Sequence, residues 1–232
     1  MRSSFQYKNL IRQIEEGNKL LAILIDPEKF DITTSEKFLK IIPKQTTHLF
    51  LGGSTVPEKL MERLIDSLRM HTKLPLIIFP GAASQISEKA DALLFLSLVS
   101  GNNPEYLIGQ QKAGAAQLLK SKLEVIPTGY LLIDGGSESA VANVTNTLPM
   151  PQSNIEGIVH TALAAELMGA KSIYLEAGSG ANIPVSAQVI NAVKQVLTIP
   201  LIVGGGIRTA EQKKLSYDAG ANMVVMGTVF EA

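Results

Sequence analysis

The sequence of 232 residues contains no cysteine. Disulfides, thiolate metal sites and a cysteine nucleophile are therefore excluded. Its 21 basic and 21 acidic side chains cancel, so net charge gives no indication of nucleic-acid binding. No apolar run approaches the roughly 20 residues that span a bilayer, and the N-terminal segment carries Glu15 and Glu16 where a signal peptide would have its apolar core. We therefore expect a cytoplasmic protein that does not span a membrane.

Short apolar runs recur along the chain, bounded by turn residues and mostly followed by helical patterns. The runs predict eight strands, over 20–26, 47–53, 74–81, 92–98, 124–134, 172–178, 200–206 and 222–227. Helical patterns cover 34–42, 57–71, 155–170, 185–197 and 209–219, and a further helix is expected to start near Pro104. Strands and helices therefore alternate over almost the whole chain.

Continuously apolar strands that alternate with helices are typical of a parallel sheet covered on its outer face. Eight such strands favour a closed (β/α)8 TIM barrel, an α/β fold, over an open sheet. No linker-like stretch divides the chain, so we expect a single domain over 1–232, with an N-terminal helix and a loop at 147–154. Since only 228–232 follow the last strand, the eighth helix is expected to be short or missing. We attribute this to a truncated chain; alternatively, the N-terminal helix or a partner subunit covers the barrel there.

Glycine-rich loops follow the last three strands, at the carboxyl-terminal rim where barrel enzymes carry their active sites. They contain Gly178, Ser179 and Gly180, then Gly204, Gly205 and Gly206, and finally Gly227 and Thr228. Glycine lets backbone N–H groups approach a ligand closely, and helix N-termini after such loops attract anions. Together the loops predict a phosphate site built from backbone amides, although each alone could be a tight turn. Arg208 is the one basic residue among them, and it could equally be a solvated residue at a helix start.

Two carboxylates at strand ends are candidates for chemistry. Asp26 ends the first strand, and with Ser54 after the second it forms an oxygen cluster suited to Mg²⁺ shared with substrate phosphates. Alternatively, the Asp-Pro pair caps the next segment. Glu176 ends the sixth strand beside the expected phosphate loop, where it could act as a general base toward a hydroxyl; the alternative is a salt bridge or hydrogen bond at the barrel mouth. Tyr174 shares the strand parity of Glu176, so both should point into the barrel.

Several other chemistries lack the residues that they need. His48, His71 and His160 lie early in a strand, at a helix end and within a helix, without metal-site spacing, so packing roles are favoured. The glycine loops lack the lysine of a P-loop, and no strand ends on a lysine that could form a Schiff base. Asp134 belongs to an Asp-Gly-Gly turn at the rim and stays unassigned.

Motifs along nearly the whole chain resemble those of geranylgeranylglyceryl phosphate synthases and their PcrB-like bacterial relatives. In order they are LIDPEK (24–29), LGGS (51–54), LPLIIFPG (74–81), SLVSGNNPEYLIG (97–109), IPTGYLLID (126–134), YLEAGSGA (174–181), VGGGIRT (203–209) and MGTVFE (226–231). YLEAGSGA and SGNNPE are specific to this resemblance, whereas GGGIR is common in phosphate-binding barrels.

The resemblance implies a prenyltransferase. This family transfers a polyprenyl group from its diphosphate to the C3 hydroxyl of sn-glycerol 1-phosphate, with Mg²⁺, and so forms the first ether bond of archaeal-type lipids. It implies that Asp26 and Ser54 help hold Mg²⁺ and the diphosphate, and that Glu176 orients or deprotonates the hydroxyl with Tyr174 as the second catalytic residue. Glycerol phosphate would be bound by Tyr174, Leu175, Glu176, Ala177, Gly178, Ser179, Gly180, Gly204, Gly205, Gly206, Gly227 and Thr228.

The prenyl tail requires an apolar groove, which we expect to be lined by the third helix and by 94–111, with Tyr106 or Leu107 limiting its length. We favour a geranylgeranyl donor, and we expect a homo-oligomer because members of the family form dimers or larger rings. Two alternatives stay open. One is another phosphate-binding TIM-barrel enzyme acting on a small sugar or triose phosphate, which the apolar LFLSLV run disfavours. The other is a barrel that binds a phosphorylated ligand without turnover.

Overall fold

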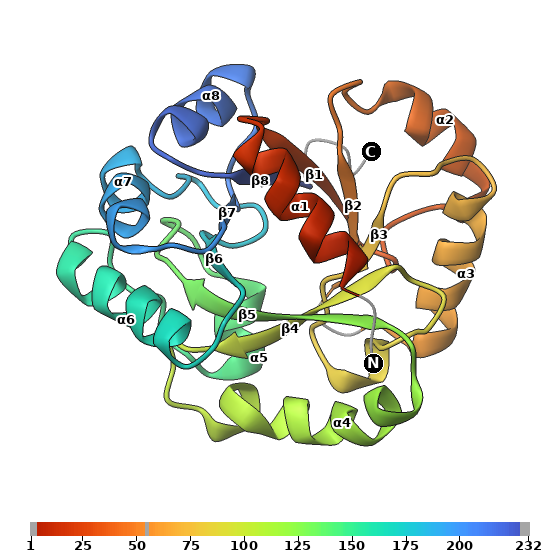
Figure 1. Cartoon of the computed structure of the whole chain (residues 1–232), viewed down its shortest axis with the longest axis horizontal. Helices are drawn as coiled ribbons and strands as arrows, with labels where there is room; N and C mark the ends of the chain where they lie inside the picture. The colour runs from red at the N-terminus through yellow and green to blue at the C-terminus, as the bar shows by residue number, and fades with distance from the viewer. Residues whose placement is uncertain (1–3, 54–55, 228–232) are drawn as a thin grey trace.

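Eight parallel strands form a closed barrel in which each strand pairs with the next and β8 pairs with β1. The computed structural model describes residues 4–53 and 56–227, and Figure 1 looks into the barrel. The strands are β1 (Leu20–Ile25), β2 (His48–Leu51), β3 (Leu76–Ile78), β4 (Ala92–Leu98), β5 (Glu124–Leu132), β6 (Ser172–Glu176), β7 (Leu201–Gly204) and β8 (Met223–Met226). The predicted (β/α)8 barrel is confirmed, although most strands are shorter than their apolar runs.

Side chains along each strand alternate between the barrel interior and the layer beneath the helices, as the pleat of a strand requires. Ala22, Phe50 and Tyr174 belong to the interior, whereas Ile23 and Leu175 pack in the outer layer. A residue two positions beyond an interior side chain therefore also faces inward. This parity brings strand-end residues to the carboxyl-terminal opening of the barrel.

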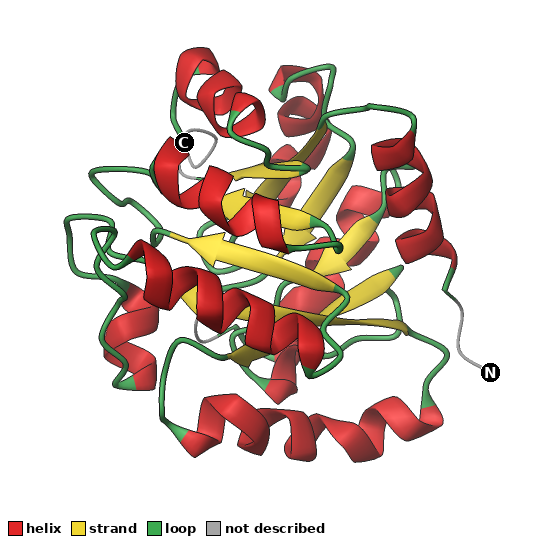
Figure 2. Cartoon of the chain, turned by 60° about the vertical axis from the view of Figure 1, so that its left-hand side comes forward, coloured by secondary structure: helices red, strands yellow, loops and turns green. Residues whose placement is uncertain are grey.

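Helices pack around the outside of the strands, as Figure 2 shows. They are α2 (Ser35–Ile41), α3 (Glu58–Arg69), α4 (Gln110–Lys120), α6 (Ile155–Leu167), α7 (Ala187–Val196) and α8 (Ala210–Asp218). Side chains cap the later helices: Asn154 accepts from the N–H of Gly157, and Thr209 and Gln212 form a capping box on α8. Within the part of the chain that the structure describes, no helix is long and apolar enough to cross a membrane.

The regular alternation is interrupted between β3 and β4. The connection, all of it described, contains only the 3-10 turn η2 (Ala83–Gln85). Nearby, the π-helical turn η3 (Glu105–Gly109) leads into α4, and the short helix α5 (Ala140–Thr145) follows β5; another 3-10 turn, η1 (Ile32–Thr34), precedes α2. The sequence pattern did not predict α5, because six residues are too few for a clear helical period. A three-residue turn cannot cover the sheet as a full helix does, so the outer wall is thin after β3.

The predicted N-terminal helix is α1 (Phe5–Glu15), which lies across the amino-terminal opening of the barrel in front of the strands in Figure 1. Leu10 packs into the barrel interior, and Glu124 accepts hydrogen bonds from the N–H groups of Gln6 and Tyr7, each at 2.8 Å. A carboxylate is favourable at a helix N-terminus. The helix therefore closes the bottom of the barrel and does not replace an outer helix beside β8. The segment 228–232, where a short eighth helix was expected, lies outside the described residues.

Candidate functional site

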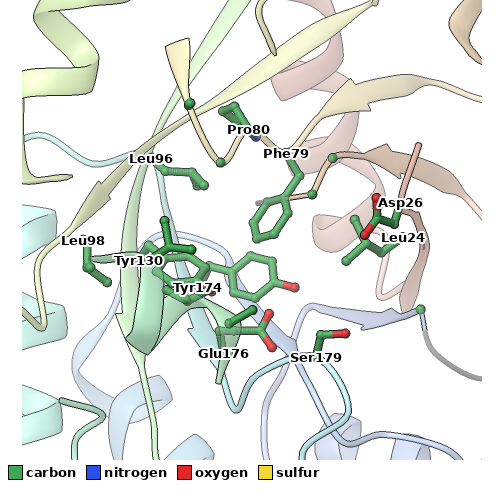
Figure 3. Close-up of a pocket in the computed structure, with 18 of the residues that line it drawn as sticks. Leu24, Asp26, Phe79, Pro80, Leu96, Leu98, Tyr130, Tyr174, Glu176 and Ser179 are labelled. Atoms are coloured by element: carbon green, nitrogen blue, oxygen red, sulfur yellow. The ribbon is translucent and has the colours of Figure 1, made fainter. Parts of the chain in front are cut away.

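A cavity of about 330 Å³ opens at the carboxyl-terminal ends of the strands. Residues predicted to serve different functions line it together: Asp26, Tyr174, Glu176, Ser179, Gly205, Gly206 and Gly227. In Figure 3, Glu176 and Tyr174 lie side by side, with Phe79 above them and Asp26 on the other side of the opening from Leu98. The structure thus brings the catalytic candidates, part of the phosphate-binding set and the metal-binding candidate Asp26 to one place.

Glu176 is the last residue of β6, and only 5% of it is exposed. Its Oε1 accepts a hydrogen bond from the N–H of Gly178 at 2.7 Å. Burial raises the pKa of Glu176 from 4.5 to about 7, while hydrogen bonds from the Gly178 N–H and the Tyr174 hydroxyl partly oppose the rise. A carboxyl group with a pKa near neutrality is suited to take a proton from a substrate hydroxyl.

The hydroxyl of Tyr174 is buried and has no hydrogen-bond partner of standard geometry among the described residues. It nevertheless lies near enough to Glu176 to lower the pKa of that carboxyl. Burial raises the pKa of Tyr174 and of Tyr130 well above the ordinary tyrosine value, so both hydroxyls stay protonated at neutral pH. A buried donor without a good acceptor calls for an explanation, and a ligand oxygen in the cavity would supply the acceptor.

Gly204, the last residue of β7, and Gly205, which follows it, lie directly against these two side chains. A Cβ atom at Gly204 would overlap the Tyr174 hydroxyl, and one at Gly205 would overlap Oε1 of Glu176. Gly205 also has φ of +83°, a conformation that L side chains rarely adopt. Both positions must therefore be glycine to admit the tyrosine and the glutamate, whatever the backbone binds. The sequence pattern suggested only the second reason, a close approach of ligand to backbone.

The loop after β6 forms the rim beside Glu176. Gly178 and Gly180 have φ of +103° and +74°, and Ser179 between them lines the cavity. Arg208, beyond the β7 loop, donates a hydrogen bond from its guanidinium to the carbonyl of Gly180 at 3.0 Å. The two glycine loops are thereby tied together, with one cation beside them. Backbone N–H groups and a cation at such a rim can hold a phosphate.

Some residues expected to bind glycerol phosphate do not face the cavity. Leu175 and Ala177 have the opposite parity and pack beneath the helices, and the N–H of Ala177 donates to the carbonyl of Gly204 at 3.0 Å. Ser54 and Thr228 lie outside the described residues. The cavity is therefore lined by only part of the set of residues expected to bind glycerol phosphate.

The histidines have the packing roles expected from the sequence. His48 is buried in β2, where burial lowers its pKa to about 4 and its Nδ1 lies 2.8 Å from the Thr47 hydroxyl. His71 and His160 are exposed on the surface. In the described ranges no three acidic or histidine side chains converge to hold a metal ion by themselves.

Asp26 stands at the end of β1 with 17% of its side chain exposed. Its Oδ1 accepts a hydrogen bond from the N–H of Glu28 at 3.0 Å, and its Oδ2 lies 3.6 Å from Nζ of Lys29. A Cβ atom at Gly53 would crowd this carboxylate, so the glycine after β2 leaves room for it. The single carboxylate of Asp26 fits a Mg²⁺ site, because Mg²⁺ is commonly bound by one or two carboxylates together with substrate phosphates and water.

The rest of the cavity is an apolar groove. The rings of Phe79 and Tyr174 stack with centroids 5.0 Å apart, and Tyr130 tilts against Tyr174 at 5.5 Å. Beyond them the lining includes Leu96 and Leu98, then Ala83, Ile86, Leu93, Phe95, Tyr106 and Val144. Leu93 and Phe95 have the outward parity of β4, so the groove passes through the thin wall after β3. It includes part of the expected 94–111 segment and Tyr106, whereas Leu107 does not line it.

Phe79 and Tyr130 were not singled out from the sequence. Both fall inside motifs, LPLIIFPG and IPTGYLLID, but an aromatic residue in an apolar run is ordinary core composition. Strand parity would have found Tyr130, since it shares the parity of Ile126 and Thr128 and lies near the end of β5. Phe79 follows β3 directly, and its neighbour Gly52 packs against its backbone.

A model of the PcrB family matches residues 12–232. The chain belongs to the PcrB family. Among curated members, a geranylgeranylglyceryl phosphate synthase of Zunongwangia profunda is 54% identical over 222 residues, which is 96% of this chain and 95% of that one. The enzyme of the same name from Flavobacterium johnsoniae is 49% identical over 97% of this chain and 93% of its own length. The likeness to these PcrB-family proteins thus spans nearly the full length of each.

Solved structures agree with this assignment. The (S)-3-O-geranylgeranylglyceryl phosphate synthase of Thermoplasma acidophilum, crystallised in complex with its substrate sn-glycerol-1-phosphate, superposes with a TM-score of 0.89. It is 36% identical, and the alignment covers 100% of this chain and 92% of that one. A second structure, the enzyme of Thermoplasma volcanium, gives a TM-score of 0.90 at 37% identity.

Proposed function

We propose that this PcrB-family chain is a prenyltransferase that moves a polyprenyl group, with geranylgeranyl favoured, from its diphosphate to the C3 hydroxyl of sn-glycerol 1-phosphate. The observation that carries the proposal is the continuity of one cavity. A buried carboxyl group and glycine loops lie at one end, and an apolar groove leads away from them. A small sugar phosphate would leave that groove without an occupant.

The acceptor half is built by β6 and β7. Glycerol phosphate binds with its phosphate at the loops around Ser179 and Gly206 and beside Arg208, where backbone donors and a cation favour an anion. The C3 hydroxyl then lies toward Glu176, which orients it and accepts its proton. The Tyr174 hydroxyl donates to an oxygen of the acceptor or to the Glu176 carboxylate, which satisfies its buried O–H.

The donor half combines the Asp26 side of the rim with the groove. Asp26, together with Ser54 in the undescribed segment, would hold Mg²⁺. When bound, the ion supplies neutralisation of the negative charge on the diphosphate. The prenyl tail lies along Leu96 and Leu98 toward Tyr106, and this apolar lining favours a hydrocarbon chain.

The reaction follows from these positions. The bond between the allylic carbon and the diphosphate oxygen breaks, and its electron pair leaves with the diphosphate. The glycerol oxygen forms the new bond to that carbon, and its proton passes to Glu176. Because both reactants are held in one cavity, positioning supplies much of the rate. We further propose that the protein is cytoplasmic and homo-oligomeric.

The test is a product assay with Mg²⁺, radiolabelled sn-glycerol 1-phosphate and prenyl diphosphates from C15 to C35. We expect a labelled product that organic solvent extracts, and its loss when the metal is chelated or the acceptor is replaced by sn-glycerol 3-phosphate. Failure to obtain extractable label with any donor would refute the proposal. Turnover of a triose or sugar phosphate in parallel reactions would then support the alternative barrel enzyme. Binding without any turnover would support a non-catalytic barrel.

A further inference from the structure

Two basic side chains line the cavity in the part of the chain that the structure describes, Lys29 and Arg208. They come from different parts of the rim. Arg208 donates a hydrogen bond to the carbonyl of Gly180 and so belongs to the phosphate loops. Lys29 follows β1 and lies beside Asp26, on the side where the donor diphosphate is expected.

A tight turn fixes the backbone of Lys29. The N–H groups of Lys29 and Phe30 both donate to the carbonyl of Asp26, at 3.1 and 3.0 Å. The Lys29 ammonium lies 3.6 Å from Oδ2 of Asp26, and about half of the side chain, 53%, is exposed. Lys29 lines the cavity with its ammonium beside Asp26, so a diphosphate bound at Asp26 would lie within reach of this cation.

We infer that Lys29 binds the diphosphate of the prenyl donor and stabilises the charge that it gains on leaving. The inference rests on the proposed function, and it assigns each rim cation to one anion: Arg208 to the glycerol phosphate and Lys29 to the diphosphate. The carbon–oxygen bond of the donor breaks with its electron pair on the diphosphate, so negative charge increases there and nowhere else on the donor. A cation placed at that point binds the transition state more tightly than the ground state.

A purely structural role for the ion pair with Asp26 explains less. Lys29 is about half exposed, and an ion pair in which one partner is solvated stabilises a fold only slightly. Lys29 also contacts the cavity, which a surface ion pair has no need to do. The matched comparison is Lys40 on α2, which pairs with Glu36 at 2.6 Å and does not line the cavity.

The test compares Lys29→Met, Lys29→Arg and the control Lys40→Met with the wild-type protein. Isothermal titration calorimetry with Mg²⁺ present measures the binding of inorganic diphosphate and, separately, of sn-glycerol 1-phosphate. Since a hydrogen bond to a charged group contributes about 1.5–3 kcal/mol, we expect Lys29→Met to weaken diphosphate binding about 10-fold or more. Lys29→Arg should stay within about threefold of wild type, because it keeps the charge. Glycerol phosphate affinity should change less than twofold in every variant, and Lys40→Met should leave both affinities unchanged.

Equal diphosphate affinity of Lys29→Met and wild type would overturn the inference, as would a wild-type protein that binds no diphosphate. An equal loss of affinity for both ligands would also overturn it, because it indicates a general disturbance of the site. Unfolding midpoints of all variants check that they are folded. The proposed function fails separately, if wild-type protein makes no ether product; the Lys29 inference fails alone if wild type makes product but Lys29→Met binds diphosphate normally.

Discussion

Replacing Glu176 by glutamine should stabilise the protein at alkaline pH while removing its activity. The folded protein binds the Glu176 proton more tightly than the unfolded chain, because burial raises the pKa from 4.5 to about 7. Stability from this group is therefore fully present below pH 4.5 and is lost as the pH rises through about 7. The pKa difference between the folded and unfolded states corresponds to about 3 kcal/mol in the free energy of unfolding. Glutamine has no charge to bury, so it should recover about 1–3 kcal/mol of this loss at pH 8.

The assay is urea unfolding of the wild type and Glu176→Gln, without ligands, at pH 5 and pH 8. The free energy of unfolding should differ little between the two proteins at pH 5 and should favour the variant at pH 8. In the same buffers, the kcat/KM of the wild type should rise with pH through an apparent pKa near 7, since the carboxylate is the active form. Loss of a general base should lower turnover by about 10²–10⁴-fold.

Glu124→Gln is the matched control, because Glu124 is also a buried carboxylate but lies at the opposite end of the barrel under α1. It should weaken the attachment of α1 at both pH values and leave the pH profile of kcat/KM unchanged. The reasoning is refuted if Glu176→Gln is no more stable than the wild type at pH 8. A wild-type kcat/KM that is flat between pH 6 and pH 8 would also refute it.

Three further changes test other parts of the site. Tyr174→Phe should raise the pKa of Glu176, so the kcat/KM profile should move to higher pH with a stability change below about 1 kcal/mol; an unmoved profile would contradict the contact. Gly205→Ala should destabilise the fold by about 1–3 kcal/mol and abolish activity, as unfolding and product assays would show. Gly17 also has a positive φ, but a Cβ atom there would meet no neighbour, so the control Gly17→Ala should lower stability without lowering activity. A loss of activity in Gly17→Ala as large as that in Gly205→Ala would refute the explanation. Tyr106→Ala should shift donor preference toward longer prenyl chains, read by chromatography of the products, whereas Leu107→Ala should not.

Much of the barrel could be predicted because buried parallel strands are continuous apolar runs, and eight of them are visible in the sequence. The position of the site followed from strand parity. A residue at the end of a strand faces the opening of the barrel when it is an even number of positions from an interior side chain. That rule places Asp26 and Glu176 correctly in the cavity. The helix α5 was missed because its six residues carry no clear period.

An apolar groove was expected along 94–111, and part of that segment lines it. Its path between β3 and β4 could not be read from the sequence, since it depends on a full helix that does not form there. The short turn η2 leaves outward-facing Leu93 and Phe95 uncovered by a full helix, and only the folded chain shows that they line the cavity. The fit of Gly204 and Gly205 against Tyr174 and Glu176 is equally a matter of tertiary contact. Glycine after a strand predicts a freely rotating backbone. The structure adds that the Tyr174 hydroxyl and the Glu176 carboxyl occupy the space that a side chain at these positions would fill.

Burial has two consequences in this cavity that belong to one mechanism. It raises the pKa of Glu176 so that the carboxyl can exchange a proton near neutral pH. The rings of Phe79, Tyr130 and Tyr174 pack against one another beside Glu176 and leave only 5% of that residue exposed, which limits its contact with water. Water competes with the glycerol hydroxyl for an activated allylic carbon, so a solvated site would hydrolyse the donor. Under the proposed function, the burial that raises the pKa of Glu176 would therefore also favour the glycerol hydroxyl over water as the attacking group.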